Sequence, residues 1–167
     1  MEVLITNEQN AVNINTDFVK EIAIEIMSFI GLPDNSQLSM VFCDDEAIKE
    51  LNSQYRNKNE PTDVLSFPIE LENFIPEIRM LGDIVISTKT AIKQAKEYNH
   101  STETEIVILL IHGLLHLNGY DHIKEDEREI MQSKEKETFK HICGINKFSN
   151  IYNNSTEPLI ERASESV

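Results

Sequence analysis

The sequence has few cysteines and no long apolar run. Cys43 and Cys143 are its only cysteines and form no CxxC pair, which is typical of reduced thiols in a cytoplasmic protein. No apolar run reaches the roughly 18 residues that suggest a membrane span. The first ten residues lack the basic and apolar regions of a secretory signal. These absences predict a cytoplasmic protein with no membrane partner.

Basic residues are also scarce. The chain carries 15 lysines and arginines against 29 aspartates and glutamates, a net charge of −14. Nucleic-acid-binding proteins normally show a basic surface, so this balance argues against a general nucleic-acid binder. It does not exclude a nuclease with a local basic cleft, but it predicts weak binding without such a cleft or a guiding partner.

The length of 167 residues and the hydrophobic content of 40% fit one globular domain with a sizeable core. We predict a single domain over residues 1–146. The remaining residues, 147–167, are polar and weakly periodic, and predict a C-terminal tail that is disordered or loosely packed.

Hydrophobic periodicity predicts an α+β fold: one small mixed sheet of about four strands, covered by several helices. Strands are expected at 3–6, 38–43, 64–70 and 81–87. Helices are expected at 15–31, after Asp44, at 88–99, from Thr102 to the turn at Gly119, and at roughly 124–143. Loops are expected at 52–63 and 71–80. Pro68 places its strand at an edge or an end, and Thr102 with Glu105 matches a capping box.

Three of the five histidines lie in one eleven-residue window, HGLLHLNGYDH. His112 and His116 are four residues apart in an apolar, helix-like segment, so they point the same way. Gly119 can end the helix and return the chain toward them, which brings His122 close. Three neutral imidazoles with an open fourth position are typical of a catalytic zinc site. The segment is apolar nearly all round, so its helix should be central.

Gly113 is a departure from the metzincin pattern H-E-x-x-H-x-x-G-x-x-H, which this window otherwise repeats. The glutamate that Gly113 replaces is the general base of peptide hydrolysis. A glycine here could also serve only to let another element pack closely. In either case the protease base is missing, which predicts a metallohydrolase of another kind.

Three motifs together resemble the bacterial YbeY-type ribosomal-RNA maturation endoribonucleases. They are LNSQYRNKNEPTDVLSFP, LGDIVIS and HGLLHLNGYDH, in the family's order, and the resemblance runs from about Leu38 to Asp126. It implies a small α+β metalloprotein with a four-stranded sheet and a zinc ion held by His112, His116 and His122. It further implies a single-strand-specific role in small-subunit 3′-end maturation and ribosome quality control. The implied partners are ribosomal RNA, ribosomal particles and assembly factors.

The resemblance also implies that Arg56 faces the same cleft and is needed for activity. A planar guanidinium suits phosphate oxygens, although a surface arginine or a salt bridge is the plain alternative. Lys58 could add charge, but a loop lysine is usually only solvated. Lys89, Lys93 and Lys96 share a helical face that is more simply the solvent-facing side.

Several short polar side chains are secondary candidates. Asp121 could orient a ligand imidazole or cap the turn after Gly119. Asp83 and Asp63 could form hydrogen bonds in the cleft or in turns. Ser66 could line the cleft or fill a strand. His100 and His141 lie outside the cluster and are expected to be ordinary surface residues.

Two other functions compete with the ribonuclease. A metalloprotease fits the ligand spacing but lacks the base at Gly113. A non-enzymatic ribosome assembly factor, in which metal only fastens the histidine helix to the next turn, fits the net charge of −14. Within the ribonuclease reading, the sequence does not decide whether a metal-activated water or the RNA 2′-OH attacks phosphorus.

Overall fold

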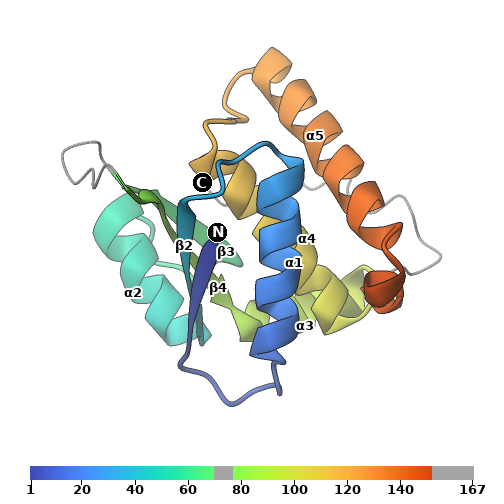
Figure 1. The fold of residues 1–167 in the computed structure, drawn as a ribbon. Helices are drawn as coiled ribbons and strands as arrows, with labels where there is room; N and C mark the ends of the chain where they lie inside the picture. Colours follow the sequence, from blue (N-terminus) through green and yellow to red (C-terminus); the bar gives the residue numbers. More distant parts are fainter. Residues whose placement is uncertain (70–76, 152–167) are drawn as a thin grey trace.

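The structure is a computed structural model that describes residues 1–69 and 77–151. Its elements follow in the order β1 (Glu2–Asn7), α1 (Thr16–Phe29), β2 (Ser36–Cys43), α2 (Asp45–Arg56), β3 (Val64–Pro68), β4 (Arg79–Ser87), α3 (Thr88–Glu97), α4 (Thr102–Leu117), α5 (Glu125–Cys143) and a 3₁₀ helix η2 (Asn146–Ile151) (Figure 1). The predicted α+β fold with about four strands is confirmed.

The four strands form one mixed sheet in the order β1-β2-β4-β3. β1 pairs with β2 and β2 with β4 in parallel, whereas β3 pairs with β4 in antiparallel fashion. β3 is therefore an edge strand, as Pro68 predicted. A register shift opposite Gln37 and Leu38 leaves Leu81 as an extra residue in β4, next to Gly82.

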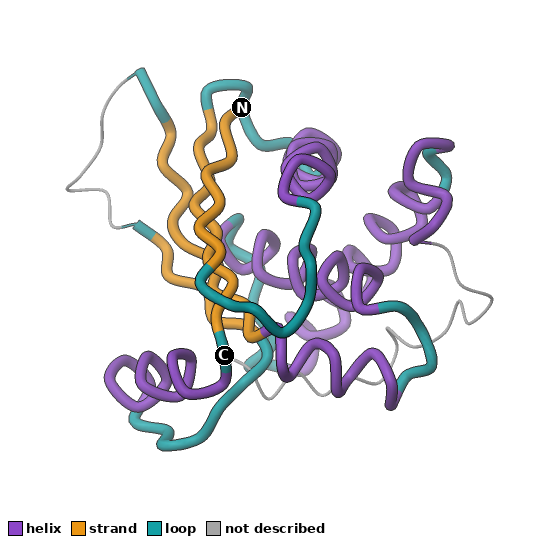
Figure 2. Tube along the Cα trace, turned by 90° about the horizontal axis from the view of Figure 1, so that it is seen from below, coloured by secondary structure: helices purple, strands orange, loops and turns teal. Residues whose placement is uncertain are grey.

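Helices cover the two faces of the sheet unequally. α1, α4 and α5 lie on one side and α2 on the other (Figure 1), and Figure 2 shows the same layering from below. In β4, Ile84 and Ile86 belong to the main core with α1 and α4, while Val85 belongs to a smaller core beneath α2. α4 is buried along most of its length, so the histidine helix is central as predicted. No helix within the described ranges is long and apolar enough to cross a membrane.

The prediction of a loop from residue 52 was wrong at its start, because α2 continues to Arg56. The end of this helix is polar, so its sequence lacks the apolar periodicity that marks a buried face. Tertiary contacts hold it instead: the Asn52 side chain donates to the Glu60 carbonyl at 2.9 Å. Asn57 then ends the helix in the left-handed conformation, with φ of 57°.

The predicted capping box of α4 was also wrong. Ser101 is the N-cap, and its hydroxyl accepts from the Thr104 amide at 3.0 Å. Glu105 is fully buried and pairs instead with His100, Nε2 to Oε2 at 2.5 Å. The side chain of His100 is 1% exposed, so this histidine is not the surface residue that the sequence suggested.

The packed core extends beyond the predicted domain end at residue 146. η2 carries Phe148 and Ile151, which are both fully buried. The Ile151 carbonyl accepts from the Thr104 hydroxyl at 2.9 Å, and the side-chain amide of Asn150 donates to the Glu103 carboxylate at 3.0 Å. The first five residues of the predicted tail thus pack against the start of α4. The rest of that tail, and residues 70–76, lie outside the described residues.

Candidate metal centre and its cleft

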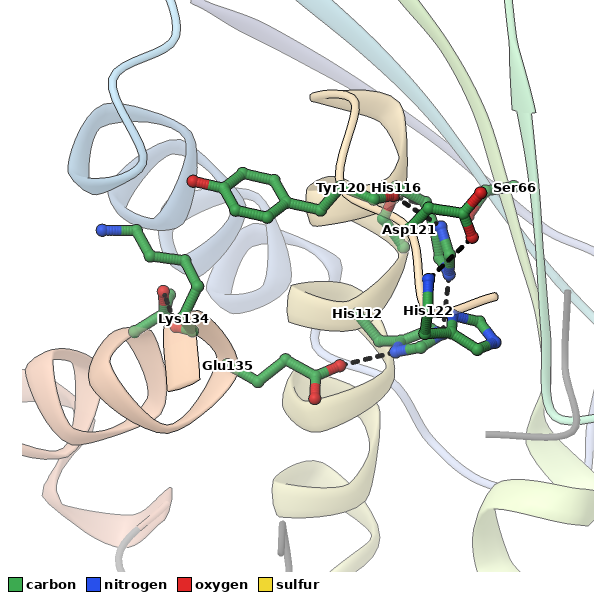
Figure 3. Close-up of polar contacts among 10 residues, drawn as sticks. Ser66, His112, His116, Tyr120, Asp121, His122, Lys134 and Glu135 are labelled. Atoms are coloured by element: carbon green, nitrogen blue, oxygen red, sulfur yellow. Dashed lines mark hydrogen bonds and ion pairs between the residues drawn. The ribbon is translucent and has the colours of Figure 1, made fainter. Parts of the chain in front are cut away.

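His112, His116 and His122 converge on one point. The first two lie one turn apart on α4, and the third lies in the turn that follows (Figure 3). One nitrogen of each ring lies within 4.8 Å of one from each of the others, and His112 and His122 are each only 8% exposed. Three imidazoles on one point, from different directions, could hold a metal ion.

The turn that delivers His122 follows the geometry expected of a helix end. Gly119 has φ of 93°, and its amide and that of Tyr120 donate to the carbonyls of His116 and Leu115 at 3.0 Å each. The Asp121 carboxylate accepts from the amide of His122 at 2.7 Å. Asp121 therefore stabilises the turn, one of the two roles expected for it.

The hydrogen bonds of two rings show which nitrogens face the centre. His116 Nδ1 lies 3.0 Å from the Tyr120 carbonyl, and His112 Nδ1 lies 2.5 Å from Oε1 of Glu135 (Figure 3). A carbonyl and a carboxylate only accept, so both Nδ1 atoms carry the hydrogen. In neutral rings the two Nε2 atoms, 3.1 Å apart, then present lone pairs to each other. Such opposed lone pairs fit a cation between them.

The pKa of His116 supports the same assignment. Burial lowers it, and the neighbouring His112 and His122 lower it further, from the ordinary value of 6.5 to about 4. Asp121 and the Tyr120 carbonyl oppose this shift only in part. His116 is thus neutral at pH 7 and needs no deprotonation before it binds a metal.

His112 and His116, two of the three clustered histidines, line an open cleft of about 250 Å³. Its lining residues are Arg56, Val64, Ser66, Pro68, His112, His116, Gly119, Tyr120 and Asp121. Arg56, at the end of α2, donates from Nη2 to the Ser66 carbonyl at 2.9 Å, and its guanidinium lies 5.8 Å from the ring centre of Phe67. The structure thus brings Arg56 and Ser66 to the cleft that holds the histidines.

Gly113 faces the sheet at very short range. A Cβ at this position would lie 3.0 Å from Cδ1 of Ile84 and 3.1 Å from the hydroxyl of Ser66. The Ser66 hydroxyl also donates to the Gly113 carbonyl at 3.4 Å. The glycine therefore lets α4 pack closely on β3 and β4, the plain alternative that the sequence left open.

Other sequence candidates lie away from the cleft. Asp83 pairs with Phe67 across the strands, on the α2 side of the sheet, and lines no part of the cleft in the described chain. Lys58 is exposed beyond α2, and Lys89, Lys93 and Lys96 are exposed on α3. Asp63 accepts from the Val64 amide at 2.7 Å and from the Gln94 side chain at 3.2 Å, which is a structural role.

Glu135 and the carbonyl of Tyr120 are site groups that sequence reasoning missed. Glu135 lies on α5, four residues after Met131 and three before Thr138, which are both buried. These positions share one helical face. An acidic residue on the inward face of a charged helix was therefore the available signal.

Comparison with known proteins identifies the family of this chain. The sequence profile of the family described as Endoribonuclease YbeY matches residues 4–143. Proteins named Endoribonuclease YbeY from Finegoldia magna and Syntrophomonas wolfei are 45% and 41% identical, over 85% and 81% of this chain and 94% of each relative. The solution structure of TM1509 from Thermotoga maritima shares the fold, with a TM-score of 0.61 and 24% identity over 92% of this chain and 97% of that one. The resemblance seen in the three motifs is confirmed, and the chain belongs to the YbeY endoribonuclease family.

Proposed function

We propose that this protein is a cytoplasmic, zinc-dependent endoribonuclease that cuts single-stranded regions of ribosomal RNA. The reaction would serve 3′-end maturation of the small-subunit RNA and ribosome quality control. The observation that carries this proposal is that His112 and His116, two members of a three-histidine cluster, line the same cleft as the guanidinium of Arg56. Membership of the YbeY family supports the reaction class.

His112, His116 and His122 would hold the ion. Three nitrogen donors suit zinc in a catalytic site, where a fourth position stays open for water or substrate. A bound ion supplies Lewis acidity, which polarises a phosphoryl oxygen or lowers the pKa of a water. The three side chains do no acid–base work in this proposal, because each commits its ring nitrogen to the ion.

Arg56 would bind the phosphate oxygens at the cut bond. The Ser66 carbonyl holds the guanidinium through Nη2, which leaves its other N–H groups for a substrate. A guanidinium keeps its charge at any physiological pH and offers paired donors to two oxygens. It thus stabilises the charge that grows on the phosphate in the transition state.

The overall acidity makes partners important. A net charge of −14 repels RNA at long range, so the cleft must supply the local attraction. We propose that ribosomal particles and assembly factors bring the RNA to the cleft. Binding to free RNA should then be weak and strongly salt-dependent.

A metalloprotease is disfavoured on two grounds. Gly113 packs against Ile84, so the position of the protease base faces the sheet, and a Cβ there would already crowd Ile84 at 3.0 Å. A peptide substrate of such an enzyme would need to pair with the free edge of β3. On that strand the Ser66 carbonyl already accepts a hydrogen bond from Arg56, and Pro68 has no N–H to donate.

The test is cleavage of a small-subunit ribosomal-RNA precursor, free and within ribosomal particles, by zinc-loaded protein. We expect the unmutated protein to cut and His112→Ala to be inactive. Arg56→Ala should lower kcat/KM about 10²- to 10³-fold, as loss of one charge-stabilising donor does. Lys58→Ala removes a nearby exposed positive charge and is the matched control.

The product ends separate the two routes of attack. A 5′-phosphate indicates attack by water, whereas a 2′,3′-cyclic phosphate indicates attack by the RNA 2′-OH. Absence of cleavage by metal-loaded protein on both substrates, with ribosomal particles still bound, would instead favour the non-enzymatic assembly factor.

A further inference from the structure

We propose that Glu135 is a positioning residue of the metal centre, and that through it the docking of α5 and the binding of metal stabilise each other. This inference rests on the metal site of the proposed function. Its basis is one contact between two helices: Oε1 of Glu135 lies 2.5 Å from Nδ1 of His112 (Figure 3).

Glu135 differs from the other acidic residues of α5 in its burial. Its side chain is 14% exposed, whereas those of Glu137 and Glu125 are 58% and 78% exposed. Burial of a carboxylate costs free energy unless a partner compensates for it. His112, with a side chain that is 10% exposed, is the partner found here.

The contact fixes the chemistry of one ligand. The carboxylate accepts the hydrogen of Nδ1, so in the neutral ring the lone pair lies on Nε2, which is 3.1 Å from Nε2 of His116. A negative acceptor also makes the imidazole a stronger ligand, because it stabilises the positive charge that metal binding draws onto the ring. His116 has only the neutral carbonyl of Tyr120 in the same place. Glu135 thus gives His112 a charged outer partner, where His116 has a neutral one.

The contact also joins two elements. The three histidines all come from α4 and the turn after it, so α5 itself supplies no ligand. Glu135 makes α5 part of the centre nonetheless. If metal binding strengthens the contact between Glu135 and His112, it favours the docking of α5 by some factor. Thermodynamic linkage then requires that docked α5 raise the affinity for the metal by that same factor.

The experiment measures zinc affinity by competition with a chelator, without RNA. Glu135→Gln keeps the shape and one acceptor oxygen but loses the charge, and Glu135→Ala loses both. Removal of such an outer partner typically weakens metal binding 10- to 100-fold. We expect a loss of about 10-fold for Gln, a larger loss for Ala, and less than 2-fold for the control Glu137→Gln, which removes an exposed carboxylate from the same helix.

Hydrogen exchange of the α5 amides provides the second measurement. Zinc should slow exchange in α5 of the unmutated protein and of Glu137→Gln, and should do so much less in Glu135→Gln. A purely structural salt bridge predicts another result: faster exchange in α5 and a lower Tm already in the zinc-free variant, with unchanged zinc affinity. That result would overturn the inference.

The inference and the proposed function fail in different ways. If the unmutated protein binds no zinc, the proposed metal site itself is wrong. If it binds zinc and cuts RNA while both Glu135 variants keep its affinity, only the role of Glu135 is wrong. Should Glu135→Ala not fold, the isosteric Gln variant decides alone.

Discussion

At the scale of single residues, the glycine at position 113 explains why a metzincin-like ligand pattern occurs without a protease base. Ile84, against which it packs, is fully buried and has little room to move. The missing side chain is thus a packing requirement of α4 on the sheet. It also implies that restoring the glutamate would disrupt this packing before it could create a base.

Gly113→Ala tests this packing directly. Alanine gains about 1 kcal/mol in helix propensity, but overpacking costs about 1–3 kcal/mol, so we expect a net loss of about 1 kcal/mol in unfolding free energy. Ile84→Val removes Cδ1, the nearest atom at 3.0 Å. In that background the loss from Gly113→Ala should shrink by at least about 0.5 kcal/mol.

Denaturant unfolding of the four proteins in this cycle provides the measurement. Gly144→Ala is the control, since a Cβ there would meet its nearest neighbour at an ordinary 3.4 Å. If Gly113→Ala lowered the unfolding free energy equally with Ile84 and with Ile84→Val, contact with Ile84 would not be the reason that glycine is required at position 113.

At the scale of elements, the hairpin of β3 and β4 holds one side of the cleft. Val64, Ser66 and Pro68 of β3 line it, and β4 fixes where β3 lies. Gly82, beside the extra residue of β4, has φ of 132°, and a Cβ on it would lie 2.1 Å from the Phe67 carbonyl oxygen. The cleft wall therefore depends on a glycine outside the cleft.

Gly82→Ala should destabilise the protein much more than Gly31→Ala. Both glycines have positive φ, so both substitutions introduce backbone strain of about 1–3 kcal/mol. The new Cβ at Gly82 would also collide with backbone atoms, whereas a Cβ at Gly31 would have nothing within 4 Å. We expect an additional loss of at least about 2 kcal/mol, measured by thermal or denaturant unfolding. Similar losses at the two positions would contradict the close approach of β3 and β4.

Element prediction from sequence succeeded where burial produces a pattern and failed where single contacts decide. All four strands were found from their apolar residues. The end of α2 was missed because Asn52 and Arg56 belong to a polar helix end held by tertiary contacts. The capping box of α4 failed because Glu105 serves His100 rather than the helix start, and no local pattern shows that pairing.

At the scale of the whole molecule, the site combines segments far apart in sequence. The three histidines come from one window and were predictable from their spacing alone. Arg56 was identified only through family resemblance, because nothing local separates it from a surface arginine. Glu135 was missed because its partner His112 lies 23 residues away on another helix. Long-range contacts of this kind are fixed by packing, which single-sequence patterns do not encode.

The C-terminal η2 helix extends the domain, and Phe148 is its anchor. This ring is fully buried and contacts Phe18 edge-on at 5.6 Å between ring centres. Phe148→Ala should lower the unfolding free energy by about 3–5 kcal/mol, as expected for a buried aromatic residue. Ser149→Ala, at an exposed position of η2, should change it by less than about 0.5 kcal/mol.

Thermal and denaturant unfolding of both variants would check this expectation. Nearly equal stabilities would mean that residues 147–151 behave as a tail after all.

The clustering of all three ligands within eleven residues has a consequence for the unfolded chain. A metal ion can reach His112, His116 and His122 without any long loop having to close, so the unfolded state keeps some affinity for it. Ligand binding stabilises a protein only by the difference between its affinities for the two states. The rise in Tm on adding zinc will therefore understate how tightly the native centre binds. The rise itself measures what Glu135, which lies outside that window, and the rest of the fold add to the three histidines, and the shortfall measures the affinity that the unfolded chain keeps.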